Sequence, residues 1–158
     1  MELKPKGVLM SIKPKYTKKI YLGEKTVELR RQAPTLIGPG DMVVIYESSP
    51  VQAITGMFEC GLIDTKENPM MLWPEVHNKC CLSFEEFLSY FDGAQKGSMI
   101  EIKDYFKFGG GVTLETLRYE INNFRPPQSF TYIAEERDSV LYDLIKILYK
   151  KYKEGASH

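Results

Sequence analysis

The stretch GVLMSIKPKYTKKIYLGEKTVELRR, residues 7–31, predicts a strand, a helix and a second strand in close succession. It opens with six mostly apolar residues, which predict a buried strand, and Pro14 then fits the first turn of a helix. Gly23 is expected to end that helix one residue after Leu22, because glycine readily adopts the left-handed conformation found after helix ends. Alternating apolar and polar residues over 26–30 then predict a second strand with one buried face.

The polar face of this second strand is the densest group of functional side chains in the sequence. Glu28 and Arg30 share that face because strand side chains repeat every two residues, and Lys25 stands where the strand begins. Lysine and arginine at such a position can hold a phosphate or a carbonyl oxygen, while the glutamate accepts a hydrogen bond or acts as a base. A solvated strand with cross-strand ion pairs fits the same spacing and is the commoner arrangement.

Outside this stretch, short strands and short helices follow one another without regular alternation. Strands are expected over 42–47, 53–60 and 97–108, and helices over 83–91, 113–120 and 135–153. The helix at 83–91 begins with an S-x-x-E capping box, and the glycines at 109–111 are expected to break the chain into a flexible loop. The pattern predicts one α+β domain over residues 1–158: a small mixed β-barrel decorated by short helices, with the long C-terminal helix packed on it.

The charge of the chain is sorted along the sequence, although its net value is zero. Residues 1–31 carry a net charge of +6, residues 32–138 carry −8, and the remainder carries +2. This distribution favours one electropositive face for an anionic ligand on an otherwise acidic body. No apolar run approaches the about 20 residues that span a bilayer, so we expect a cytoplasmic protein with no membrane partner.

The cysteines do not form a recognisable metal or disulfide pattern. Their odd number fits reduced thiols, as expected in the cytoplasm. His77, Cys80 and Cys81, with Cys60 earlier, could supply metal ligands, but adjacent cysteines rarely serve one zinc ion and no C-x-x-C pair is present. The sequence therefore predicts buried thiols, no metal site and no cofactor.

Four segments of the chain together resemble the ASCH domain family (activating signal cointegrator homology), which belongs to the PUA-like superfamily of RNA-binding β-barrels. They are SIKPKYTKKIYLGEKTVELRR, the P-x-x-x-x-P-G-D-M-V-V-I-Y that follows it, S-F-E-E-F-L-S-Y-F, and R-P-P-Q-S-F. The similarity runs from about Gly7 to Tyr132, and its most specific part is G-x-K-x-x-E-x-R, residues 23–30. The chain is most similar to the stand-alone prokaryotic and phage ASCH proteins.

The resemblance implies a five- or six-stranded barrel with a cleft beside the first helix, where RNA or a modified nucleotide or nucleoside binds. Lys25, Glu28 and Arg30 occupy positions of the motif, and three residues close to them in sequence complete the expected set. The expected ligand-binding residues are Ser11, Lys13, Lys25, Glu28, Arg30 and Arg31.

The resemblance also raises the alternative of a hydrolase. Some ASCH relatives remove the acetyl group of N4-acetylcytidine with a lysine, a threonine and a glutamate, and others are ribonucleases. Lys25 matches that lysine, but Glu28 occupies the position of the threonine, so the nucleophilic hydroxyl is missing. The sequence leaves open whether the protein only binds its ligand or is an enzyme with Lys25 and Glu28 as catalytic residues. A third possibility is an interaction protein whose helix over 135–153 docks a partner.

Overall fold

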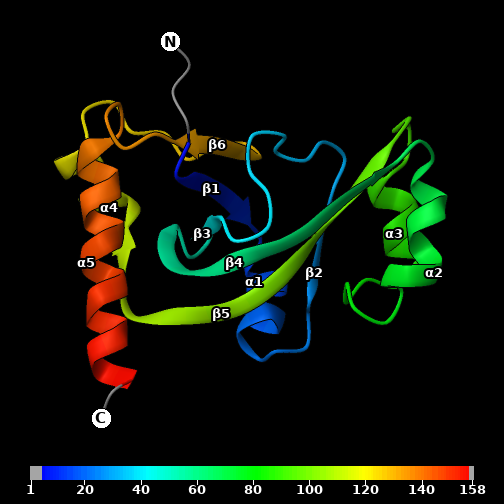
Figure 1. Ribbon diagram of the computed structural model, residues 1–158, viewed down its shortest axis with the longest axis horizontal. Helices are drawn as coiled ribbons and strands as arrows, with labels where there is room; N and C mark the ends of the chain where they lie inside the picture. Colours follow the sequence, from blue (N-terminus) through cyan, green and yellow to red (C-terminus); the bar gives the residue numbers. More distant parts are fainter. Residues whose placement is uncertain (1–4, 157–158) are drawn as a thin grey trace.

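The computed structural model describes residues 5–156, and its centre is a curled six-stranded sheet (Figure 1). The strands are β1 (Gly7–Ile12), β2 (Val27–Arg30), β3 (Met42–Glu47), β4 (Ala53–Lys66), β5 (Gly97–Thr113) and β6 (Phe130–Ile133). Their order across the sheet is β2-β5-β4-β3-β1-β6, so β2 and β6 are its edges. Strands β1 and β3 pair in parallel, and the other neighbours pair antiparallel.

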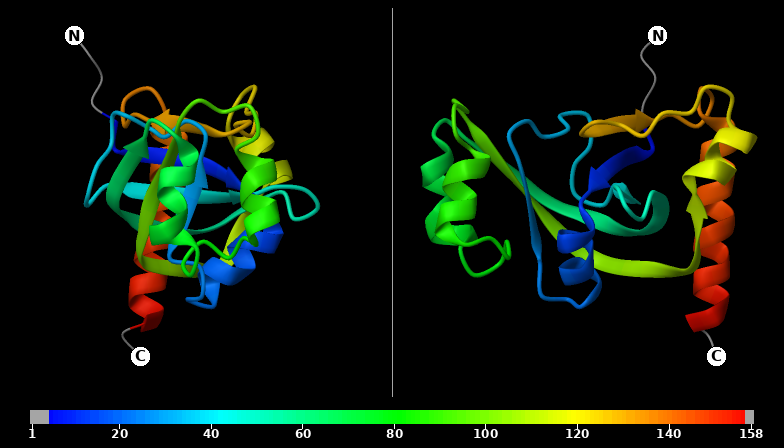
Figure 2. Two further views of the ribbon diagram at one scale, coloured as in Figure 1. Left: turned by 90° about the vertical axis from the view of Figure 1, so that its right-hand side faces the viewer. Right: turned by 180° about the vertical axis from the view of Figure 1, so that it is seen from behind.

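Helices cover both ends of this sheet. They are α1 (Pro14–Tyr21), the 3₁₀ helix η1 (Pro69–Leu72), α2 (Trp73–Val76), α3 (Phe84–Tyr90), α4 (Leu114–Glu120) and α5 (Ser139–Ala156). The views in Figures 1 and 2 place α2 and α3 at the far end of the long β4–β5 hairpin, and α4 and α5 at the opposite end. We call η1, α2 and α3, residues 69–90, the helical lobe. Among residues 5–156, no helix is both long and apolar enough to cross a membrane.

Three apolar clusters hold these layers together. One lies between α1 and the sheet and includes Ile20 and Phe58, and a second lies between the sheet and α5. The third joins Val27 and Leu29 of β2 to the helical lobe. The apolar residues of α5 that pack in the second cluster include Leu141, Leu144, Ile145, Leu148 and Tyr152. The predicted α+β fold, with a barrel-like sheet and the long C-terminal helix packed on it, is confirmed.

The glycine-rich segment at 109–111 does not form the predicted loop, because β5 continues through it to Thr113. At Gly111 the backbone runs so close to β4 that a Cβ atom would lie 2.4 Å from the carbonyl oxygen of Ile54. Glycine thus allows close strand pairing here rather than a chain break. β4 is also longer than the predicted 53–60, because its outer half pairs with β5 as far as Lys66.

The C-terminal helix begins at Ser139 rather than at residue 135. The backbone N–H of Ala134 donates to Oδ2 of Asp138, and residues 135–138 form a turn before the helix. The backbone N–H of Asp138 also donates to the carbonyl oxygen of Ala134 at 2.8 Å, so the turn is closed by two hydrogen bonds between these residues before the regular helix begins.

Candidate functional site

Arg30 bridges the gap between the two edge strands of the sheet. Its Nη1 donates to Oγ of Ser129, one residue before β6, at 3.2 Å, and its Nη2 donates to the carbonyl oxygen of Ser11 in β1 at 2.8 Å. The backbone N–H of Ser11 donates to the carbonyl oxygen of Ser129 at 2.9 Å, and the Ser11 hydroxyl donates to that of Pro127 at 2.6 Å. We call this junction of β2, the end of β1 and residues 127–129 the seam.

Glu28 and Arg30 are buried together at the seam. They are 6% and 9% exposed, and Arg30 Nε lies 3.9 Å from Glu28 Oε1. Glu28 Oε2 and Arg30 Nε have no hydrogen-bond partner, and no other buried side-chain nitrogen or oxygen of residues 5–156 shares that state. Buried polar groups are normally paired, because leaving one unpaired costs about 1–3 kcal/mol. The two free atoms therefore mark a position where a polar ligand would gain hydrogen bonds.

The solvated strand that the spacing alone favoured is wrong. All four residues of β2 are buried. Val27 and Leu29 face the helical lobe, while Glu28 and Arg30 lie on the opposite side of the strand. Covering both faces of an edge strand leaves its charged side chains without the water that stabilises exposed ion pairs.

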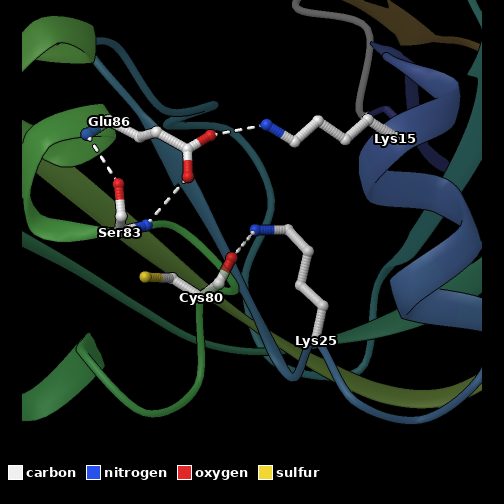
Figure 3. A network of polar contacts seen from close by, with 5 residues as sticks. All are labelled: Lys15, Lys25, Cys80, Ser83 and Glu86. Atoms are coloured by element: carbon white, nitrogen blue, oxygen red, sulfur yellow. Dashed lines mark hydrogen bonds and ion pairs between the residues drawn. The ribbon is translucent and has the colours of Figure 1, made fainter.

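Lys25 is also withdrawn from solvent and is 1% exposed. Its Nζ donates to the carbonyl oxygen of Cys80 at 2.5 Å, a contact visible in Figure 3. The same Nζ lies 5.0 Å from the centre of the Tyr16 ring, within the range of a cation–π contact. An ammonium group has three donors, and lysine is almost never fully buried unless it is paired. Within residues 5–156, the Lys25 ammonium group contacts a carbonyl oxygen and an aromatic ring but no carboxylate.

The helical lobe is tied to α1 and β2 beside these residues. Lys15 Nζ donates to Glu86 Oε2 at 2.6 Å, and the other oxygen of Glu86 accepts from the backbone N–H of Ser83, the N-cap of α3 (Figure 3). The hydrogen bond from Lys15 is the main reason that the pKa of Glu86 falls from 4.5 to about 2. The capping box predicted at residues 83 and 86 is confirmed, and its glutamate also links two elements across the site. On the other side, the hydroxyl of Tyr90 donates to the carbonyl oxygen of Leu29 at 3.2 Å.

Two tyrosines border the charged group. Burial raises the pKa of Tyr90, while the nearby Arg30 opposes that shift. Burial also raises the pKa of Tyr16, and the positive charge of Lys15 opposes it. Both phenols therefore stay neutral at physiological pH, and that of Tyr90 donates to the carbonyl oxygen of Leu29.

The structure brings three of the six predicted ligand-binding residues, Ser11, Glu28 and Arg30, together at the seam. Lys25 is linked to them through Tyr16, whose ring lies 5.0 Å from its Nζ and whose phenol is also influenced by the charge of Glu28. The side chains of Lys13 and Arg31 are exposed and make no hydrogen bond or ion pair among the described residues. Sequence reasoning did not single out Ser129 or Tyr90. The stiff R-P-P-Q-S-F segment carries the signal that could have found Ser129, because paired prolines fix their own φ and exclude the α region for the residue before each of them, which keeps the chain leading to Ser129 extended.

The cysteines are free thiols in this structure. Cys60 and Cys80 are buried, and burial raises the pKa of Cys60 to about 11. Among residues 5–156, no group of three or more histidine, cysteine, aspartate or glutamate side chains could hold a metal ion.

Chemically, the site combines two buried cations with one buried carboxylate. Arginine and lysine are the side chains that bind phosphate and carboxylate oxygens, and arginine does so with a fixed fork of donors. Lys25 and Arg30 outnumber Glu28, so the group as a whole favours an anion. Glu28 Oε2 remains available to accept a proton or a hydrogen bond from that ligand.

The curled sheet with helices at both ends makes this chain a small α+β protein with a half-barrel sheet. Residues 5–118 match the family model described as a domain of unknown function, DUF365. The chain is 30% identical over 139 residues to an ASCH domain-containing ribonuclease of Zymomonas mobilis, an alignment that covers 88% of this chain and 92% of the relative. This chain belongs to the ASCH domain family.

Solved structures agree with that assignment. The crystal structure of ASCH from Zymomonas mobilis superposes with a TM-score of 0.78 at 29% identity, covering 88% of this chain and 95% of that chain. A serine-to-alanine variant of the same protein gives a TM-score of 0.80 at 27% identity, covering 90% and 99%. The N-terminal domain of McrB from Staphylothermus marinus shares the fold alone, with a TM-score of 0.55 at 12% identity over 88% of this chain and 94% of that domain.

Proposed function

We propose that this protein binds RNA at the seam and cleaves the RNA backbone there. The observation that carries the proposal is the buried group of Lys25, Glu28 and Arg30, in which Glu28 Oε2 and Arg30 Nε have no hydrogen-bond partner among the described residues. A phosphodiester between two cations would pair with the free donor, and a ribose hydroxyl would pair with the free carboxylate oxygen. The relative at 30% identity that is named a ribonuclease supports the same class of substrate.

In the proposed reaction, the ribose 2′-oxygen attacks the adjacent phosphorus. Glu28 takes the proton of the 2′-hydroxyl, the 2′-O–P bond forms, and the bond from phosphorus to the 5′-oxygen of the next nucleotide breaks. Arg30 and Lys25 stabilise the extra negative charge on the phosphate oxygens, and the Lys25 ammonium gives a proton to the departing 5′-oxygen. The products are a 2′,3′-cyclic phosphate and a 5′-hydroxyl.

The surrounding residues have supporting parts in this proposal. Ser11 and Ser129 hold the guanidinium of Arg30 in place, since both accept its hydrogen bonds. Lys13 and Arg31, exposed at either side, bind neighbouring phosphates of the strand. Because Lys25 donates to the Cys80 carbonyl oxygen, the RNA phosphate competes with that carbonyl for the ammonium group.

An RNA-cleavage assay with end-group analysis tests the proposal. The wild-type protein is expected to convert a labelled RNA into fragments ending in a 2′,3′-cyclic phosphate, and a strand with a 2′-deoxyribose at the cleaved position is expected to stay intact. Glu28→Gln keeps the shape of the side chain but loses the base, so cleavage is expected to fall by about 10²–10⁴-fold. Glu115→Gln, the same substitution at an exposed position of α4, is the matched control and is expected to retain cleavage.

Binding is measured separately, with the uncleavable 2′-deoxy strand. Affinity is expected to fall with salt, and Arg30→Met is expected to reduce the slope of log affinity against log salt by about one. If the protein binds RNA in a salt-dependent way but leaves it intact, the seam is a binding site and the proposed cleavage is wrong. No binding by folded protein, or equal cleavage by wild type and Glu28→Gln, would refute the proposal.

The amidohydrolase alternative has less support. Thr26, the hydroxyl nearest in sequence to Lys25, is exposed while Lys25 is buried. Thr17 is buried, but its hydroxyl already donates to a side-chain oxygen of Glu47. Incubation with N4-acetylcytidine is expected to leave this nucleoside unchanged.

A further inference from the structure

Residues of α5 and the sheet line a cavity of about 660 Å³. Figure 1 places α5 at the end of the molecule away from the helical lobe. The floor of the cavity is aliphatic and comes from four residues of three strands: Met42 and Val44 of β3, Met57 of β4 and Ile133 of β6. The volume falls within the range of about 300–1,000 Å³ that is typical of small-molecule sites. No acidic residue lines it.

The helix side of the cavity keeps apolar side chains partly in water. Ile147 is 52% exposed and Tyr149 is 38% exposed, although both line the cavity beside the buried Ile145. Protein interiors are normally packed without gaps of this size. A ligand with an apolar body would therefore bind favourably here, because it would bury the exposed apolar side chains at the border of the cavity.

The rim of the cavity is basic. Lys6, Lys146 and Lys150 line it. In the described part of the chain, neither Lys146 nor Lys150 pairs with a carboxylate, and Lys6 meets Glu135 only at 3.7 Å with both side chains half exposed. Exposed pairs of this kind exchange easily because they contribute little free energy. An anionic group at the rim would thus meet cations that have no strong competitor.

We propose that this cavity binds an amphipathic carboxylate with an unbranched aliphatic body, of the size of a medium-chain fatty acid. The chain lies on the aliphatic floor formed by β3, β4 and β6, and the carboxylate lies at the rim between Lys146 and Lys150. An aliphatic chain suits this floor better than a nucleic acid does, because a nucleic acid carries a phosphate on every nucleotide and would need cations along its length. The site is separate from the seam, so its occupancy does not depend on the proposed cleavage of RNA.

Isothermal titration of the full chain with dodecanoate, below its micelle concentration, tests the proposal. Saturable binding at one site is expected, and dodecanol, which has the same chain without the charge, is expected to bind about tenfold more weakly. Methyl signals of Ile133 and Ile145 are expected to shift in NMR spectra during the titration, because both residues line the cavity.

Charge-reversal variants locate the head group. Lys146→Glu and Lys150→Glu are each expected to weaken dodecanoate binding about tenfold. Lys151→Glu, on the same helix but not on this rim, is the matched control and is expected to leave the affinity within about twofold. These positions are exposed, so the variants are expected to fold.

Three results would overturn the proposal. The first is the absence of saturable binding, or binding without shifts at Ile133 and Ile145. The second is equal affinity for dodecanoate and dodecanol, which would remove the role of the lysines. The third is a loss with Lys151→Glu as large as the loss with Lys146→Glu, which would indicate attraction to the whole helix rather than a site.

Discussion

Replacing Arg30 by methionine tests how far the seam holds the fold together. Methionine keeps a long apolar side chain but cannot donate to Ser129 Oγ or to the carbonyl oxygen of Ser11, which now accept at 3.2 Å and 2.8 Å. The change also leaves Glu28, whose side chain is 8% exposed, without the cation that lies 3.9 Å away. Arg30→Met should therefore destabilise the protein far more than a typical surface substitution.

The size of the effect follows from these contacts. A hydrogen bond to a charged group contributes about 1.5–3 kcal/mol, and breaking a buried ion pair by removing one partner costs about 3–5 kcal/mol. The two contributions overlap because the same guanidinium makes both, and water can reach the half-buried Ser11 and the exposed Ser129. We expect the free energy of unfolding to fall by about 3–5 kcal/mol, which for a domain of this size lowers Tm by about 10 °C.

Urea denaturation followed by the fluorescence of Trp73, the single tryptophan of the chain, measures this change. Arg31→Met is the control, because Arg31 is the next residue and carries the same charge on an exposed side chain. Its free energy of unfolding is expected to stay within about 0.5 kcal/mol of the wild-type value. Adding Glu28→Gln to Arg30→Met removes the unpaired buried charge and is expected to restore part of the loss. A loss below about 1 kcal/mol for Arg30→Met, or no recovery in the double variant, would refute the reasoning.

Three further predictions concern the sheet, the lobe and the thiols. Gly111→Ala places a Cβ atom 2.4 Å from a backbone oxygen of β4 and should lower the free energy of unfolding by about 1–3 kcal/mol, measured by urea denaturation. Gly109→Ala is the control, because the space around Gly109 is open, and it should change this free energy by less than about 0.5 kcal/mol. Glu86 should titrate near pH 2 by NMR, so its contribution to stability is present above pH 4.5 and is lost as pH falls through about 2. Lys15→Ala should move the midpoint of the Glu86 titration upward. An unchanged midpoint would contradict the role given to Lys15. Under native conditions iodoacetamide should modify Cys81 before the two buried thiols, which mass spectrometry of the intact chain and its peptides would show; early modification of a buried thiol would contradict this order.

Local patterns of the sequence predicted most of the elements correctly. The strand at 42–47 and the capping box of α3 were predicted because their signals lie within a few residues of one another. The shared face of Glu28 and Arg30 was also predicted, since it follows from the period of a strand. In contrast, the glycines at 109–111 were assigned to a loop. A run of glycines looks the same in the sequence whether it forms a flexible turn or allows two strands to approach closely.

The burial of the site could not be predicted from these local signals. Tyr90 is 61 positions from Leu29, whose carbonyl oxygen it contacts, and Ser129 is 99 positions from Arg30. Strand periodicity states which side chains share a face, but what covers that face depends on such distant segments. For this reason the spacing alone favoured a solvated strand, and only the family resemblance indicated a functional one.

The long sequence separation across the seam also affects when the site exists. Contacts within the β4–β5 hairpin and the helical lobe join segments closer in sequence, and such contacts tend to form earlier than the bond between Arg30 and Ser129. At a synthesis rate of about 5–20 residues per second, the 99 positions between Arg30 and Ser129 take roughly 5–20 s to translate. A nascent chain therefore has no completed seam until Ser129 has been synthesised. The proposed RNA cleavage would begin only after β6, the last strand of the sheet, has left the ribosome.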